Sequence, residues 1–147
     1  MFTAEERDRV QEWLLARAEA DGAIAGAAFT GLVRHHALHA RICIERGRWW
    51  QAEPWIGATR DHVITLACLR LGYPAYYAKG AHLLPDDLTA PLAATLVRAP
   101  EEAELRRALA ATIDVVTGEL ERSDPALATR LQPMFAELAG SGNVGCA

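Results

Sequence analysis

The chain has 147 residues, of which 51% are hydrophobic and 23% are charged, and its formal net charge is −4 at pH 7. This composition is typical of one globular domain with a substantial core, and the acidic balance does not attract nucleic acid. The acidic start, Thr3-Ala4-Glu5-Glu6, is unlike a signal peptide, and no apolar run has the length that spanning a bilayer requires. We therefore expect a cytoplasmic protein without membrane contact, and we do not expect a nucleic-acid partner.

The three cysteines, Cys43, Cys68 and Cys146, form an odd set without a C-x-x-C pair. Cys43 and Cys68 fall among apolar helical positions, whereas Cys146 lies in a short tail rich in small residues. Small buried thiols are common in protein cores, and a metal or disulfide framework needs regular cysteine spacing. We expect free thiols, the state that a reducing cytoplasm maintains.

Helical spacing of the apolar residues predicts an all-α protein, an antiparallel bundle of five to six helices. The first helix begins at the capping box Thr3-x-x-Glu6, and Ser123 is expected to cap the last helix. Helices are predicted over residues 4–20, 32–46, 49 or 54 to 71, 85 or 86 to 97, 100–122 and 124–139.

The segment 23–30, AIAGAAFT, has an ambiguous pattern. Ile24 and Phe29 between glycines suit a short buried strand, whereas the alanines suit a helix. No second strand candidate follows, and a lone strand cannot satisfy its backbone hydrogen bonds. We therefore expect an orphan strand, an extended segment or a helical turn here.

The predicted helix that ends at Leu71 is apolar on nearly every side, which is typical of a central helix. Its one polar strip contains Glu53, Arg60 and Asp61 around Gly57. Glycine costs a helix about 1 kcal/mol relative to alanine, so Gly57 indicates the close approach of another group.

The preceding helix carries the pair Arg41 and Glu45, separated by four residues. Residues at this spacing lie next to each other on a helix surface. We expect a solvated ion pair at these positions.

Three histidines, His35, His36 and His39, lie close together in the helix predicted over 32–46. His35 and His39 have the i,i+4 spacing that can place two imidazoles on one metal ion. A third ligand at a suitable spacing is missing, so surface or partly buried histidines are the favoured interpretation.

The same segment contains Arg34 and His39 in an Arg-x4-His pattern. This pattern resembles the ribonuclease signature of HEPN domains, in which the pair would polarise an RNA 2′-hydroxyl and stabilise the phosphate. The motif is short, so a HEPN-like ribonuclease with Arg34 and His39 as catalytic residues is an alternative hypothesis.

A longer resemblance comes from three stretches: residues 39–72, HARICIERGRWWQAEPWIGATRDHVITLACLRLG; residues 78–80, AKG; and residues 83–88, LLPDDL. Together with the closing pair of helices they resemble the C-terminal, substrate-binding helical domain of bacterial nucleotidyltransferases of the aminoglycoside and lincosamide type. Residues 2–31 resemble the first helix and strand of the nucleotidyltransferase palm. The resemblance implies a palm-like remnant over 1–31, a helical domain over 32–139 and a disordered tail over 140–147.

The catalytic signature of that family is missing from the chain. In the family a Gly-Ser and an Asp-x-Asp hold Mg²⁺ and ATP, but here Gly31 is followed by Leu32 and no Asp-x-Asp occurs. We therefore expect no cofactor, no metal site, no catalytic residue and no nucleotidyl transfer by this chain alone.

The resemblance then implies a non-catalytic domain that binds a small polar ligand or a partner. The location of the polar strip gives Glu53, Arg60 and Asp61 as the substrate-binding candidates, with an internal ion-pair strip as the alternative. The partner could be a second copy of the chain or a separate nucleotidyltransferase palm subunit, for which this chain would be the helical partner.

Overall fold

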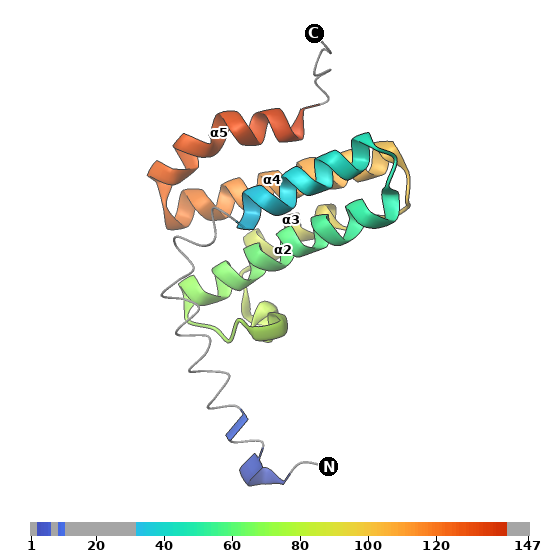
Figure 1. The fold of residues 1–147 in the computed structure, drawn as a ribbon. Helices are drawn as coiled ribbons and strands as arrows, with labels where there is room; N and C mark the ends of the chain where they lie inside the picture. The colour runs from blue at the N-terminus through green and yellow to red at the C-terminus, as the bar shows by residue number, and fades with distance from the viewer. Residues whose placement is uncertain (1–2, 7–8, 11–31, 141–147) are drawn as a thin grey trace.

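The computed structural model describes residues 3–6, 9–10 and 32–140 of the chain. Within these ranges all regular secondary structure is helical and no strand occurs, which confirms the all-α prediction (Figure 1). None of the helices described is both long enough and apolar enough to cross a membrane. The ambiguous segment 23–30 and residues 141–147 of the expected tail lie outside the described residues.

The helical domain consists of two helical hairpins and a segment that crosses between them (Figure 1). The first hairpin pairs the helical residues 32–45, here called the 32–45 helix, with the long helix α2. The second pairs α4 with α5. The bounds are α2 Trp49–Leu71, α3 Asp86–Leu92, α4 Glu102–Ser123 and α5 Pro125–Ala139, with 3-10 turns η1 Tyr76–Ala78, η2 Ala81–Leu83 and η3 Ala93–Thr95 in the crossing segment.

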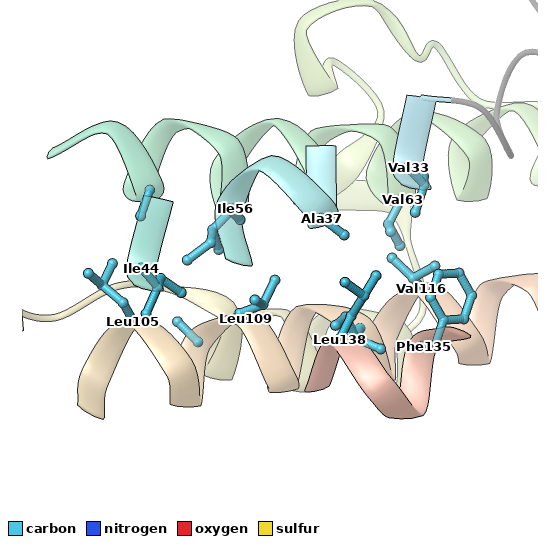
Figure 2. Packing of buried hydrophobic residues seen from close by; sticks show 14 of the residues in the cluster. Val33, Ala37, Ile44, Ile56, Val63, Leu105, Leu109, Val116, Phe135 and Leu138 are labelled. Carbon is cyan, nitrogen blue, oxygen red and sulfur yellow. The ribbon is translucent and has the colours of Figure 1, made fainter. Parts of the chain in front are cut away.

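The two long helices, α2 and α4, run in the same direction. Ile56 lies opposite Leu109 in the core, and the Val63 and Val116 side chains meet farther along both helices (Figure 2). Parallel neighbours cannot be joined by a short turn, so the crossing segment returns the chain to the other end of the bundle. The first hairpin, by contrast, turns tightly at Gly47, which has φ +69°, the left-handed conformation expected of a glycine just after a helix.

One hydrophobic core joins the 32–45 helix, α2, α4 and α5 (Figure 2). Alanines allow the 32–45 helix and α2 to approach closely, since Ala37, Ala40 and Ala52 are completely buried. Each large aliphatic side chain buried here contributes about 1.5–3 kcal/mol. The larger core residues include Val33, Ile44, Ile56, Val63, Leu105, Leu109, Val116, Leu120, Phe135 and Leu138.

A smaller apolar cluster attaches the crossing segment to the end of α2. It contains Ala67, Cys68, Ala75, Leu84 and Leu88. Cys43 in the main core and Cys68 in this cluster are both buried and free, as expected. Burial raises the pKa of the Cys68 thiol, and the nearby Glu119 carboxylate raises it further.

An ion pair between a buried carboxylate and a partly exposed arginine joins the C-terminal parts of α2 and α4. Glu119 is completely buried, and both of its carboxylate oxygens accept from Arg70, at 2.7 Å from Nε and 3.1 Å from Nη2. A buried charge is costly unless it is paired and hydrogen-bonded. The hydrogen bond to Glu119 raises the pKa of the Arg70 guanidinium.

Arg41 fastens α5 to the 32–45 helix. Its Nη1 donates to the carbonyl oxygens of Glu137, Leu138 and Gly140 at 2.8, 3.0 and 2.9 Å, while Nε donates to Glu45 at 2.7 Å. The last carbonyls of a helix lack intrahelical donors and carry partial negative charge, so a guanidinium satisfies them well. The expected Arg41–Glu45 pair is present, but the solvated pair was wrong because Arg41 is only 7% exposed.

From residue 32 onward the helix boundaries agree with the predictions within a few residues, with two corrections. Most of the helix predicted over 4–20, and its end, lie outside the described residues. The cap of α5 is Asp124, whose carboxylate accepts from the Leu127 amide at 3.0 Å; Ser123 instead donates to the Glu119 carbonyl. The helix predicted to reach residue 97 divides into α3 and η3. The predicted capping box is confirmed, since Glu6 N donates to Thr3 Oγ1 at 3.2 Å and Thr3 N donates to Glu6 at 2.7 Å.

Removal of the positive partner should expose the cost of the buried carboxylate. We expect Arg70→Met to lower the free energy of unfolding by about 3 kcal/mol, because Glu119 would stay buried without a counter-charge. Arg106→Met is the matched control: Arg106 pairs with Glu102 on the exposed side of α4, and such pairs contribute only about 0.3–0.5 kcal/mol. Urea denaturation followed by circular dichroism measures both; equal losses would contradict the structural role of the pair.

Candidate functional site

Of the three residues of the polar strip of α2, Arg60 is engaged in hydrogen bonds within the protein. Arg60 donates from Nε to Thr95 Oγ1 at 2.7 Å and from Nη2 to the Thr95 carbonyl at 3.2 Å, and Thr95 is completely buried. Glu53 and Asp61 are exposed on the same helix. Arg60 therefore attaches η3 to α2, which is a structural task.

Gly57 makes room for this arrangement. A Cβ atom at Gly57 would lie 3.7 Å from Arg60 Nη1 and 4.0 Å from Glu53 Oε1. The close approach that this glycine indicated is thus made by side chains of the same strip. Glu53, Arg60 and Asp61 line neither of the two surface hollows described below.

Arg34 and His39 lie on different sides of the 32–45 helix. Residues five apart are separated by about 140° around an α-helix. Arg34 borders a groove next to α5, whereas the His39 ring stacks on Trp55 of α2 with centroids 4.9 Å apart. The helix thus directs the two side chains of the Arg-x4-His motif to different neighbours.

Trp55 and four histidine rings form a cluster where the 32–45 helix meets α2. His35, His36 and His39 all contact the Trp55 ring, with centroids 5.7, 5.2 and 4.9 Å away. His62 joins them from α2, stacked on His36 with centroids 4.9 Å apart and an interplanar angle of 16°. These residues are called the histidine cluster below.

The members of the histidine cluster from α2 were not predicted from the sequence. Trp55 and His62 are seven residues apart, a spacing that places both on one face of a helix. In an antiparallel hairpin that face meets the neighbouring helix, which carries three histidines. The spacing of Trp55 and His62 was therefore sufficient to place both on the face toward the three histidines. The prediction instead assigned the site of α2 to its strip of charged residues.

Burial keeps the central pair of the cluster neutral. It lowers the pKa of His36, and the nearby His62, His35 and His39 lower it further. Burial also lowers the pKa of His62, against an opposing effect of Asp61. The Nδ1 atom of His36 is buried without a hydrogen-bond partner in the described part of the chain.

The cluster is not a metal centre in the geometry observed. In residues 3–6, 9–10 and 32–140, no three side chains of histidine, cysteine, aspartate or glutamate are grouped so that they could hold a metal ion.

A groove of about 290 Å³ lies between the 32–45 helix and α5. Apolar side chains of both helices line it, and charged groups stand among them. Leu38, which is 43% exposed, belongs to the wall formed by the 32–45 helix. We call this surface the α5 groove; its lining residues are Arg34, Leu38, Arg41, Ile42, Glu45, Met134, Glu137 and Leu138.

A second hollow of about 320 Å³ lies between α3 and α4. Its polar groups are Asp87, Asp114 and Arg122, and Gly118 forms part of the lining. The Arg122 guanidinium lies 3.7 Å from the Asp87 carboxylate, so two of the three charges neutralise each other. The α5 groove differs in its charges, because its Arg34 and Glu137 side chains form no ion pair within residues 32–140.

Comparison of the chain with protein-family models, with curated proteins and with solved structures gives no match.

The structural role of Arg60 can be separated from its neighbours by substitution. We expect Arg60→Met to lower the free energy of unfolding by about 1–2 kcal/mol, because Thr95 would lose a charged donor in a buried position. Glu53→Gln and Asp61→Asn should each change it by less than about 0.5 kcal/mol, as is usual at exposed positions. Thermal and urea denaturation provide the measurement, and an unchanged stability for Arg60→Met would refute its attachment to η3.

Proposed function

We propose that this chain is a non-catalytic helical binding domain, similar to the helical domain of nucleotidyltransferases without its palm, and that it takes a small amphiphilic ligand in the α5 groove. The observation that carries the proposal is the groove itself, an apolar surface with charged groups around it. Small-molecule sites are concave, mostly apolar and equipped with a few polar groups that orient the ligand. The groove volume is near the lower end of the usual range for such sites, roughly 300 Å³.

The apolar part of the groove comes from both helices. Leu38 and Ile42 of the 32–45 helix face Met134 and Leu138 of α5. Covering their exposed surface removes apolar area from water, which stabilises a complex by about 25 cal/mol per Å². A ligand with an aromatic or aliphatic body satisfies this part of the site.

The charges of the groove indicate the polar groups of the ligand. Arg41 is committed to Glu45 and to the end of α5. Arg34 and Glu137, on opposite helices, form no ion pair within residues 32–140, so each can face a ligand group of opposite charge. These features favour a zwitterion: an anionic group toward Arg34 and a cationic group toward Glu137.

The family resemblance supplies ATP and Mg²⁺, but the residues of this chain do not fit them. The chain has no Asp-x-Asp, and the described residues contain no group of three candidate metal ligands. Without paired carboxylates nothing compensates the charge of a bound triphosphate. The proposal therefore contains no transfer step.

The transfer reaction can be tested directly. We expect the purified 147-residue chain to transfer no AMP from α-labelled ATP to kanamycin or lincomycin, with or without Mg²⁺, because the metal-binding carboxylates are missing. Thin-layer chromatography of the labelled products provides the measurement. Transfer above the level of a protein-free control would contradict the non-catalytic proposal.

Ligand binding can be tested with a zwitterionic fluorescent probe, Nε-dansyl-lysine. We expect saturable fluorescence enhancement, and a Kd raised about tenfold or more by Leu38→Glu, because a buried carboxylate would replace an apolar contact. Leu83→Glu is the matched control, since Leu83 is similarly exposed at 48% but lies outside the groove. Arg34→Ala should weaken dansyl-lysine more than uncharged dansylamide.

Three outcomes would contradict ligand binding in the groove. They are the absence of saturable enhancement, equal effects of Leu38→Glu and Leu83→Glu, and a concentration-dependent dimer in light scattering that Leu38→Glu disrupts. The last result would assign the groove to a second copy of the chain.

A further inference from the structure

The histidine cluster and the α5 groove occupy different sides of the same helix. His35, His36 and His39 contact α2 residues, whereas Leu38 and Ile42 line the groove. The 32–45 helix thus contacts α2 through the imidazole rings as well as through the buried apolar core, and α5 through Arg41. Because Leu38 and Ile42 belong to this helix, a displacement of the helix from α2 would move one wall of the groove.

The stacked pair His36–His62 is the part of the cluster least compatible with positive charge. The rings lie nearly parallel, with centroids 4.9 Å apart, so protonation of both would place two like charges face to face. The Nδ1 atom of His36 is buried without an acceptor, and protonation of that atom would create a buried donor without a partner.

Other charged groups around the pair do not relieve this conflict. From its own helix, His36 is affected by His35 and His39, which add positive charge when protonated, and from α2 by His62. His62 is affected by Asp61, whose side chain is exposed to solvent. Within the described residues, no charged group of α4 or α5 contributes to the titration of either ring.

We propose that the His36–His62 pair is a pH-sensitive latch, which holds the 32–45 helix on α2 while both rings are neutral and releases it when they are protonated. The neutral rings stack on each other, and the His36 ring also contacts Trp55. Protonation separates the rings, and the cations then gain water in the open form. Histidine is the side chain whose charge changes between about pH 5 and pH 8.

The direction of the pH dependence follows from the lowered pKa values. Both His36 and His62 have a pKa below the ordinary 6.5 in the closed form, whereas the released rings titrate near that value. Well above pH 6.5 the rings are neutral in both forms and the latch is at full strength. As the pH falls below 6.5, the released form binds more protons, so the latch weakens until the closed-form pKa values are passed.

Hydrogen exchange with mass spectrometry tests the latch on the full chain. Between pH 7.5 and 5.5, after correction for intrinsic exchange, we expect amides of the 32–45 helix to lose protection at least about fivefold more than amides of α4. The variant His36→Phe/His62→Phe keeps two stacked rings that cannot be protonated, and should abolish this difference. His82→Phe is the control, because His82 lies on η2 outside the cluster.

The result divides cleanly. Loss of protection in the wild type and in His82→Phe, but not in the double variant, supports the latch. Equal protection at both pH values, or a loss that persists in the double variant, overturns it. If circular dichroism shows that this double variant does not fold, the variant His36→Gln/His62→Gln, in which neither side chain can be protonated at pH 5.5, is judged by the same criterion.

An effect of the latch on the groove rests on the proposed function. If the groove binds dansyl-lysine, its Kd should rise at pH 5.5 in the wild type and not in the double variant. Loss of protection without dansyl-lysine binding at either pH would leave the latch standing and reject the proposed function. Binding of dansyl-lysine without a pH-dependent loss of protection would support the proposed function and reject the latch.

Discussion

The carboxylate of Glu119 is the constraint on which the rest of the fold depends. A completely buried charge is tolerated only if a counter-charge reaches it with good hydrogen bonds, and Arg70 meets that requirement with two. Because Arg70 lies in the last turn of α2 and Glu119 near the end of α4, the pair sets the register of the two long helices. It also requires them to be parallel, which in turn demands the long crossing segment between them.

The crossing segment is attached by contacts of a different kind at each end. Near α2 it is apolar, with Ala75 and Leu84 buried against Cys68. Near α4 it is polar: Arg107 donates to the carbonyls of Ala94 and Leu96, and to Glu104. The hydrogen bonds that Glu104 accepts from the Arg107 side chain and from the Arg98 amide lower its pKa to about 2, so this carboxylate stays charged in all but strongly acidic solution.

Helix positions were accessible from the sequence because they depend on local rules. Apolar spacing, the glycine after residue 46 and the acidic first turn of α4 all act within a few residues, and the buried state of Cys43 and Cys68 follows from their place in the apolar pattern. Arg41 shows where such rules end. Its spacing to Glu45 predicted a surface pair, whereas its main partners are carbonyls of α5 that lie about a hundred residues away in the chain.

The candidate site was less predictable for the same reason. Arg60 sits on the expected strip, but its partner Thr95 belongs to a 3-10 turn whose position depends on the crossing segment. In the sequence, His62 is a single histidine within an apolar helix; its stacking on His36 depends on the hairpin that brings the two helices together. The α5 groove needs two helices from opposite ends of the domain. Nothing local to either helix indicates it, and the resemblance to nucleotidyltransferase helical domains remains an interpretation of the sequence.

The crossing segment also determines how the domain can assemble. Each hairpin is continuous in sequence and closes through a short turn, so its two helices can meet quickly after they form. Neither hairpin forms a complete core by itself, however. Ile56 and Val63 of the first hairpin are covered by side chains of α4, and Val33 is covered by residues of the second hairpin (Figure 2). The domain therefore consists of two hairpins joined by the crossing segment, and the cooperativity of folding arises at the interface between them. The Arg70–Glu119 pair links the two hairpins at one end of this interface.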